Sequence, residues 1–310
     1  MLASLLLGSG PVGPGAALRA LLHPGDHPDD YGMLRELRVP RTATGIVVGA
    51  ALGACGVLLQ AVTRNPVADP GILGISAGAS LAVVLGITLF GASGSAAYAP
   101  FALLGGTVAG AVAWFLAGGE RGGVVGLALA GAALAALCGA LTQALTVLDA
   151  ATLDRFRFWL VGSVAGGDLS TLAGAAPALG LGALGAVLVA PALTTLALGD
   201  DVARGLGQRV GPVRLGAALA ALLLAAGAVA VAGPIALVAL LAAHSARRLV
   251  GPGVPLQLLV AALLGVAVLV GGDLAGRLVV PARELAVGVV SPLIGAPLFV
   301  WLVTRGRTAT

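Results

Sequence analysis

The chain has 310 residues, 59% of them hydrophobic and only 10% charged. Soluble domains carry roughly 25% charged residues, so this composition excludes a soluble protein and predicts an all-α polytopic membrane protein. The net charge of +4 does not require a nucleic-acid partner, because basic residues at membrane edges account for it. No long charge-rich segment interrupts the chain, so we expect one domain over residues 1–310, embedded in the lipid bilayer.

The first apolar segment is too short to be a complete span. Residues 1–8 are apolar, whereas a spanning helix needs about 20 residues. The segment also lacks the basic start and the cleavage site of a signal peptide. Residues 9–37, with four prolines and three aspartates, are typical of an extramembrane loop with short helical pieces.

Charged residues and breaks mark the limits of nine complete predicted spans. The apolar segment 70–119 is long enough for two helices, with a break near residues 91–99. The segment 215–246 is too long for one span, and Gly233-Pro234 splits it into two helices, the second one short. The other five predicted spans are 42–63, 122–148, 169–199, 249–272 and 285–304.

A polar turn joins the first complete span to the second. Pro66 and Pro70 each lack an N–H and push the preceding residue out of the α region, so no helix continues through the turn. Asp69 before Pro70 is the pattern of an N-cap followed by proline at the first helical position. The sequence predicts two helices joined by a stiff turn, with Arg64 at the water interface.

The same turn, QAVTRNPVADPGILGISAGAS (residues 60–80), resembles the signature of the permease subunits of bacterial ABC importers for iron–siderophore complexes, haem and cobalamin. Seven further motifs follow that family's order along nearly the whole chain. They are RVPRT (38–42), FWLVGS (158–163), LGDDVARGLG (198–207), AGPI (232–235), HSARRLVG (244–251), GDLAGR (272–277) and ELAVGVVSPLIGAPLFVWL (284–302).

The resemblance implies a complex of several subunits in the bacterial cytoplasmic (inner) membrane. Members of the family have ten spans and begin with a full helix, so the resemblance implies that residues 1–8 are the tail of a truncated first helix, beside nine complete spans. We expect either that an in-frame start lies upstream of Met1 or that the first helix has been lost. They form one half of a translocation path, so we expect a homodimer or a heterodimer with a paralogous permease. Two ATP-binding cassette ATPase subunits would drive transport, and an external substrate-binding lipoprotein would deliver the cargo. We expect a ferric siderophore as cargo, with haem or cobalamin as the next candidates, and no cofactor.

The segment 198–212 is the first candidate functional element. Asp200 and Asp201 favour the first turn of a short helix, and Gly205 and Gly207 are suited to end it. The residues alone leave open a solvated loop with an interfacial helix. The resemblance implies instead a cytoplasmic coupling segment that contacts the ATPase, formed by Asp200, Asp201, Arg204, Gly205 and Gly207. Nine arginines on that side against eight on the other do not decide the orientation from charge alone, so the orientation also comes from the resemblance.

Three arginines on the opposite side are candidates for docking. Arg38 and Arg41 flank Pro40, and Arg277 follows Asp273 by one helical turn. A guanidinium presents a planar fork of donors that suits carboxylates. The residues alone leave two alternatives open: interfacial anchors, or an internal pair between Asp273 and Arg277. The resemblance implies that Arg38, Arg41 and Arg277 meet glutamates of the binding protein, and we expect all three side chains to face water.

Asn65 and Val67 match the position of a cytoplasmic gate in the family. The alternative for Asn65 is a hydrogen bond within the local turn. His244 has no second histidine or cysteine at ligand spacing, so we expect no metal site. The chain has no lysine, which excludes a GxxxxGK[ST] nucleotide motif, and we expect no enzymatic activity of its own.

Two other functions remain open on composition alone. A secondary transporter that works without an ATPase usually carries ionisable residues within its spans, and these spans hold almost none. The second alternative is a membrane scaffold that transports nothing, and the order of the motifs is the only evidence against it.

Overall fold

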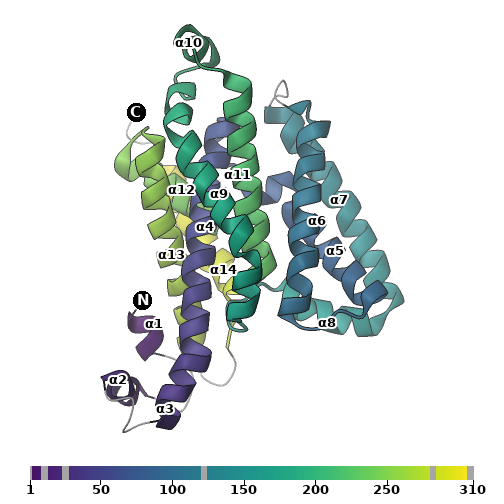
Figure 1. Ribbon diagram of the computed structural model, residues 1–310, viewed down its shortest axis with the longest axis vertical. Coiled ribbons are helices and arrows are strands. Elements are labelled where there is room, and N and C mark those ends of the chain that lie inside the picture. The colour runs from purple at the N-terminus through teal and green to yellow at the C-terminus, as the bar shows by residue number, and fades with distance from the viewer. Residues whose placement is uncertain (1, 8–12, 23–27, 120–123, 280–283, 306–310) are drawn as a thin grey trace.

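The computed structural model describes residues 2–7, 13–22, 28–119, 124–279 and 284–305. All regular elements in these residues are helical, and they form an elongated bundle (Figure 1). The helices are α1 (Leu2–Leu6), α2 (Pro14–Leu22), α3 (Pro28–Met33), η1 (Leu34–Arg38), α4 (Val39–Thr63), η2 (Pro70–Leu73), α5 (Ile75–Phe90), α6 (Ser95–Leu116), α7 (Val124–Leu148), α8 (Ala150–Leu160), α9 (Leu169–Leu196), α10 (Asp200–Gly205), α11 (Val210–Ala232), α12 (Val238–Val250), α13 (Val254–Val279) and α14 (Val287–Arg305).

Helix α4 is the central element of the bundle and packs against α9, α11, α12 and α13. Its contact with α13 is close because both helices carry glycine at the crossing. A Cβ atom added to Gly53 would overlap the carbonyl oxygen of Ala261, and one added to Gly265 would overlap the carbonyl oxygen of Gly49. Without a hydrophobic driving force between helices in lipid, such close backbone approach supplies the packing energy.

Helices α5 to α8 form a second group on one side of the bundle (Figure 1). Helices α5 and α6 form a hairpin whose turn contains Gly91 and Gly94, both with positive φ. The hairpin crosses where Gly78 and Gly105 touch, because a Cβ atom on either glycine would overlap the other helix. Tyr98 and Trp159 belong to a buried cluster that includes Val229 of α11, so this cluster joins the group to the rest of the bundle.

Each apolar segment expected to cross the membrane contains a helix, and both expected breaks are present. One expected limit is wrong, because α12 continues through Arg247 and Arg248 to Val250 and α13 begins only at Val254. The hairpin turn between α5 and α6 lies at residues 91–94, and α11 ends at Ala232 before Gly233-Pro234. Among the described residues, six helices are long and apolar enough to cross a membrane, and residues 75–90 and 287–301 form shorter apolar helices. Helix α12 has only 13 residues. The chain is therefore an all-α polytopic membrane protein.

Two features of the fold differ from the expectation. The helix that contains α4 begins well before residue 42, because α3 and η1 continue into it through residues 28–38. Helix α8 was not expected, although Asp149 gives a signal for it: its carboxylate accepts hydrogen bonds from the Ala151 N–H and the Thr152 hydroxyl, as an N-cap does.

Candidate functional site

Charged side chains gather at the two ends of the bundle. We call these the α10 end, after the helix at the top of Figure 1, and the α8 end, after the helix at the lower end of the group α5 to α8. Helix α4 runs from one to the other, so its first turn lies at the α8 end and its last at the α10 end. The functional residues expected from the sequence divide between these ends.

The turn after α4 has the predicted stiff geometry. Arg64 ends α4 with a left-handed backbone (φ 49°). The Asn65 side-chain oxygen accepts a hydrogen bond from the Val67 N–H at 3.0 Å, and Asp69 accepts one from the Gly71 N–H at 3.0 Å. Burial raises the pKa of Asp69, and the bond from Gly71 opposes that rise. Asn65 therefore stabilises its own turn, as one alternative anticipated, while Val67 beside it is exposed.

The segment 198–212 contains the expected short helix, α10, with Asp200 and Asp201 in its first turn. Gly205 is its last residue, and Gly207 follows with φ 81°. The Gly207 N–H donates to the Arg204 carbonyl oxygen at 2.9 Å, which closes the helix end. A left-handed residue in this position is what a glycine C-cap supplies.

The two aspartates of α10 have different surroundings. Asp201 is fully exposed and pairs with Arg204 at 3.0 Å. The Asp200 side chain is 23% exposed and accepts from Arg64 and from Arg214, the latter at 3.0 Å. Arg64 also donates to the Leu196 carbonyl oxygen at 3.1 Å. The sequence did not predict this cluster, because Arg64 and Asp200 are 136 positions apart.

At the α8 end, Arg41 and Arg277 lie in one buried ion network with Asp273. Arg41 donates to Asp273 at 2.7 Å through Nη2 and at 3.1 Å through Nε, and to Glu284 at 2.6 Å through Nη1. Arg277 pairs at 2.9 Å with Oδ2 of Asp273, an oxygen that Nε of Arg41 also reaches at 3.1 Å. The side chains of Arg41, Asp273 and Arg277 are 10%, 4% and 2% exposed.

The expectation that all three candidate docking arginines face water is therefore wrong for Arg41 and Arg277. The internal pair of Asp273 with Arg277 is confirmed. The close approach of α4 and α13 explains the burial, because it places Arg41 beside an acid on the neighbouring helix. An arginine so placed is desolvated, and the facing carboxylate compensates for that cost.

Arg38 lies beside this network and remains partly exposed. Its Nη1 donates to the carbonyl oxygens of Leu5 and Leu6 at 2.8 and 3.1 Å. Arg277 donates to the carbonyl oxygens of Ser4 and Leu7. The two arginines thus bind the carbonyl groups of Ser4, Leu5 and Leu6 at the end of α1 and of Leu7 just after it, where the last carbonyl groups of a helix lack partners within the helix.

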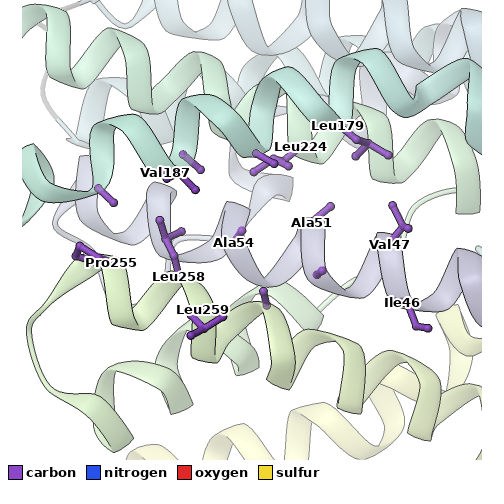
Figure 2. Close-up of a pocket in the computed structure, with 15 residues that line it drawn as sticks. Ile46, Val47, Ala51, Ala54, Leu179, Val187, Leu224, Pro255, Leu258 and Leu259 are labelled. Carbon is purple, nitrogen blue, oxygen red and sulfur yellow. The ribbon is translucent and has the colours of Figure 1, made fainter. Parts of the chain in front are cut away.

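A cavity of about 490 Å³ lies between α4, α9, α11 and α13 (Figure 2). Apolar side chains such as Ala51, Leu179 and Leu258 line it, and none of its lining residues is titratable. It therefore offers no side-chain charge for binding a charged cargo. In the described part of the chain no three metal-ligating residues gather, and the His244 ring packs edge-on against Phe299.

Comparison with known proteins shows to which family the chain belongs. The FecCD transport family matches residues 1–305. The chain belongs to the FecCD transport family. It is a multi-pass membrane permease subunit of a bacterial ABC importer, not the ATPase of that importer.

Curated relatives match almost the whole chain. The ferric enterobactin transport system permease protein FepD of Escherichia coli (strain K12) is 43% identical over 89% of this chain and 83% of its own length. The hemin transport system permease protein HmuU of Yersinia pestis is 34% identical over 99% of this chain and 94% of its own. A solved inward-facing structure of a metal-chelate type ABC transporter superposes with a TM-score of 0.84 at 27% identity, covering 98% of this chain and 95% of that one.

Proposed function

We propose that this FecCD permease is one of two permease subunits that form the path of a ferric siderophore importer. The relatives named for ferric enterobactin and ferric citrate support an iron complex as cargo. Haem is the next candidate, because one relative is named for hemin; cobalamin rests on the motif resemblance alone. The second permease subunit is another copy of this chain or a paralogue.

In this proposal the α10 end faces the cytoplasm, where two ATPase subunits bind. Nine helices cross the bilayer: α4 to α7, α9 and α11 to α14. The short helix α10 projects beyond α9 and α11, exposing Asp201 and the Gly207 turn to a partner (Figure 1). The turn with Asn65 and Val67 lies at the same end and acts as the cytoplasmic gate. Domain 1–310 works as a unit, with the coupling segment 198–212 at one end and the external loop 9–37 at the other.

The observation that carries the proposal is the family match over residues 1–305, and the experiment is reconstituted uptake. The permease, co-expressed with its ATPase and placed in proteoliposomes, is expected to import a radiolabelled ferric siderophore when ATP and the loaded binding protein are supplied. Uptake that proceeds without any ATPase would instead identify a secondary transporter.

Gly207→Pro tests the coupling segment. Proline fixes φ near −65° and removes the N–H that donates to Arg204, so α10 loses its C-terminal turn. We expect the variant to fold normally but to lose at least about tenfold in uptake, since the lost turn is worth about 1–3 kcal/mol. Gly253→Ala, at an uncrowded glycine between α12 and α13, is the control. Normal uptake by Gly207→Pro would remove the coupling role from this segment.

The binding lipoprotein is proposed to dock at the α8 end, with Arg38 as the direct contact. Arg41 and Arg277 act there by holding the docking surface in place. Single rim ion pairs are worth about 0–1 kcal/mol, so the larger effect of a charge is on the rate of encounter.

Arg38→Glu is expected to slow docking several-fold at low salt, with a weaker dependence of the rate on ionic strength, because like charges then face each other. Arg35→Glu, an exposed arginine one helical turn earlier, is the matched control. Stopped-flow binding of the lipoprotein across a series of salt concentrations measures the docking rate and its dependence on ionic strength for each variant. Equal rates and equal salt slopes for Arg38→Glu, Arg35→Glu and the unmodified permease would remove Arg38 from the docking surface.

A further inference from the structure

We infer that Asp200 is a joint between α10 and the end of α4, with Arg64 and Arg214 as its positioning residues. In this role Asp200 transmits the movement of α10 to the turn at residues 65–69 and does not itself bind the ATPase. The inference deepens the proposed function and rests on α10 being the ATPase contact.

The first observation is convergence on one carboxylate. Asp200 begins α10, Arg64 ends α4, and Arg214 lies in the first turns of α11. Both arginines reach the same oxygen of Asp200, and Arg204 of α10 lies 3.9 Å from the other oxygen. Three helices that are separate in sequence therefore meet at a single acid.

The second observation is that Arg64 bridges a fourth helix. Its Nη2 also donates to the carbonyl oxygen of Leu196, the last residue of α9. A guanidinium is a rigid fork, so two acceptors held at once fix its position more firmly than one. Arg64 at the end of α4 is thereby bonded to the last residue of α9 and to the first residue of α10.

The third observation is the contrast between neighbouring acids. Asp201 is fully exposed, and its ion pair among the described residues is with Arg204 of the same helix. Asp200 points toward the bundle, where Arg214 is only 19% exposed. Ala203 of α10 is completely buried, so α10 seats against the bundle on the side of Asp200. A partner approaching α10 from outside meets Asp201, whereas Asp200 faces the bundle.

The joint is also next to the gate in the chain. Arg64 is covalently followed by Asn65, and the turn to Pro70 is stiffened by two prolines and two side-chain-to-backbone hydrogen bonds. A stiff turn moves as a unit when one end is displaced. Displacement of α10 by the ATPase is thus passed through Asp200 and Arg64 to residues 65–69.

The test compares Asp200→Asn, Asp201→Asn and the control Asp154→Asn, which removes an exposed acid of α8 paired with Arg157. Spin labels are attached to cysteines placed at Val67 and Val202, both about half exposed, while Cys55 and Cys138 are buried. We expect Asp200→Asn to broaden the distance distribution between the labels in the purified full-length permease, and the other two variants to leave it unchanged. An unchanged distribution in Asp200→Asn would overturn the joint, whether or not the ATPase binds.

Uptake in the assembled complex is the second readout. We expect Asp200→Asn to retain the ATPase on purification and to hydrolyse ATP, while the iron complex imported per ATP falls about tenfold. Asp200→Glu, which keeps the charge, is expected to recover part of that loss. Asp201→Asn, which alters an exposed acid of α10, is expected to weaken binding of the ATPase. If Asp200→Asn also loses the ATPase on purification, Asp200 is a direct contact and the inference is wrong. If the unmodified permease binds no ATPase, the proposed function is wrong. The distances between the spin labels still test whether Asp200 links α10 to the end of α4.

Discussion

Replacing Asp273 with asparagine is expected to cost the folded permease about 3–5 kcal/mol, because it leaves two buried guanidiniums without their shared counter-ion. Arg41 and Arg277 both bond to Asp273, and neither is more than 10% exposed. Glu284 keeps one bond to Arg41, whereas no acid other than Asp273 bonds to Arg277 among the described ion pairs. The amide still accepts a hydrogen bond, but it carries no charge.

Thermal unfolding of the detergent-purified protein measures this loss. Asp154→Asn, which breaks an exposed ion pair on α8, is the control and is expected to change the free energy of unfolding by no more than about 1 kcal/mol. A triple variant with Arg41→Met, Asp273→Leu and Arg277→Met is expected to be more stable than Asp273→Asn alone, since it removes the buried charges together. Equal melting temperatures for Asp273→Asn and Asp154→Asn would show that water reaches the network.

Gly53→Val is expected to prevent accumulation of the folded permease. Even the first atom of a side chain at this position overlaps the carbonyl group of Ala261, and the obstacle is backbone that cannot rotate away. Helices α4 and α13 must then separate, which loosens the central contact of the bundle and separates Arg41 from Asp273. The expected loss in the free energy of unfolding exceeds the roughly 1–3 kcal/mol typical of overpacking. The reason is that the added side chain meets the backbone of α13, which cannot move aside as a side chain can.

Gly180→Val is the matched control for this prediction. Gly180 also lies within a long helix, α9, but a Cβ atom there meets nothing within 4 Å. Membrane-fraction yield and size-exclusion profiles distinguish the two variants. A monodisperse Gly53→Val protein at normal yield would contradict the packing described for α4 and α13.

The sequence predicted the helices well because lipid imposes a simple length rule. An apolar segment that ends at arginine, or at Gly233-Pro234, can form only a few arrangements of membrane helices. The Asp69 cap was also predictable, because its hydrogen bond joins residues only two positions apart. Helix α8 was missed because it carries Asp154, Arg155 and Arg157 and follows no apolar pattern. Abundant glycine also hid the crossing of α4 with α13, since Gly53 and Gly180 look alike until a neighbouring backbone is placed beside one of them.

The charged residues were predicted less well, because pairing depends on distant segments. Arg41 and Arg277 look like interfacial arginines from their neighbours in sequence, and only the contact of α4 with α13 shows that they are buried. The same limit applies to Asp200. Its place in a short helix follows from local sequence, but its bond to Arg64 does not.

The network at the α8 end also sets an order of events during synthesis. Arg41 enters the membrane early, with α4, whereas Asp273 is made 232 residues later. At roughly 5–20 residues per second, the ribosome needs about 10–50 s to supply that partner. Arg41 stands in the first turn of α4, so its long side chain can stay hydrated at the membrane surface during this interval. Arrival of α13 then draws Arg41 out of water. Arg38 can bind the carbonyl groups of Leu5 and Leu6 before this stage, whereas Arg277 adds its bonds to Ser4 and Leu7 only with α13. Helix α1 thus completes its described hydrogen bonds only after α13 has been made.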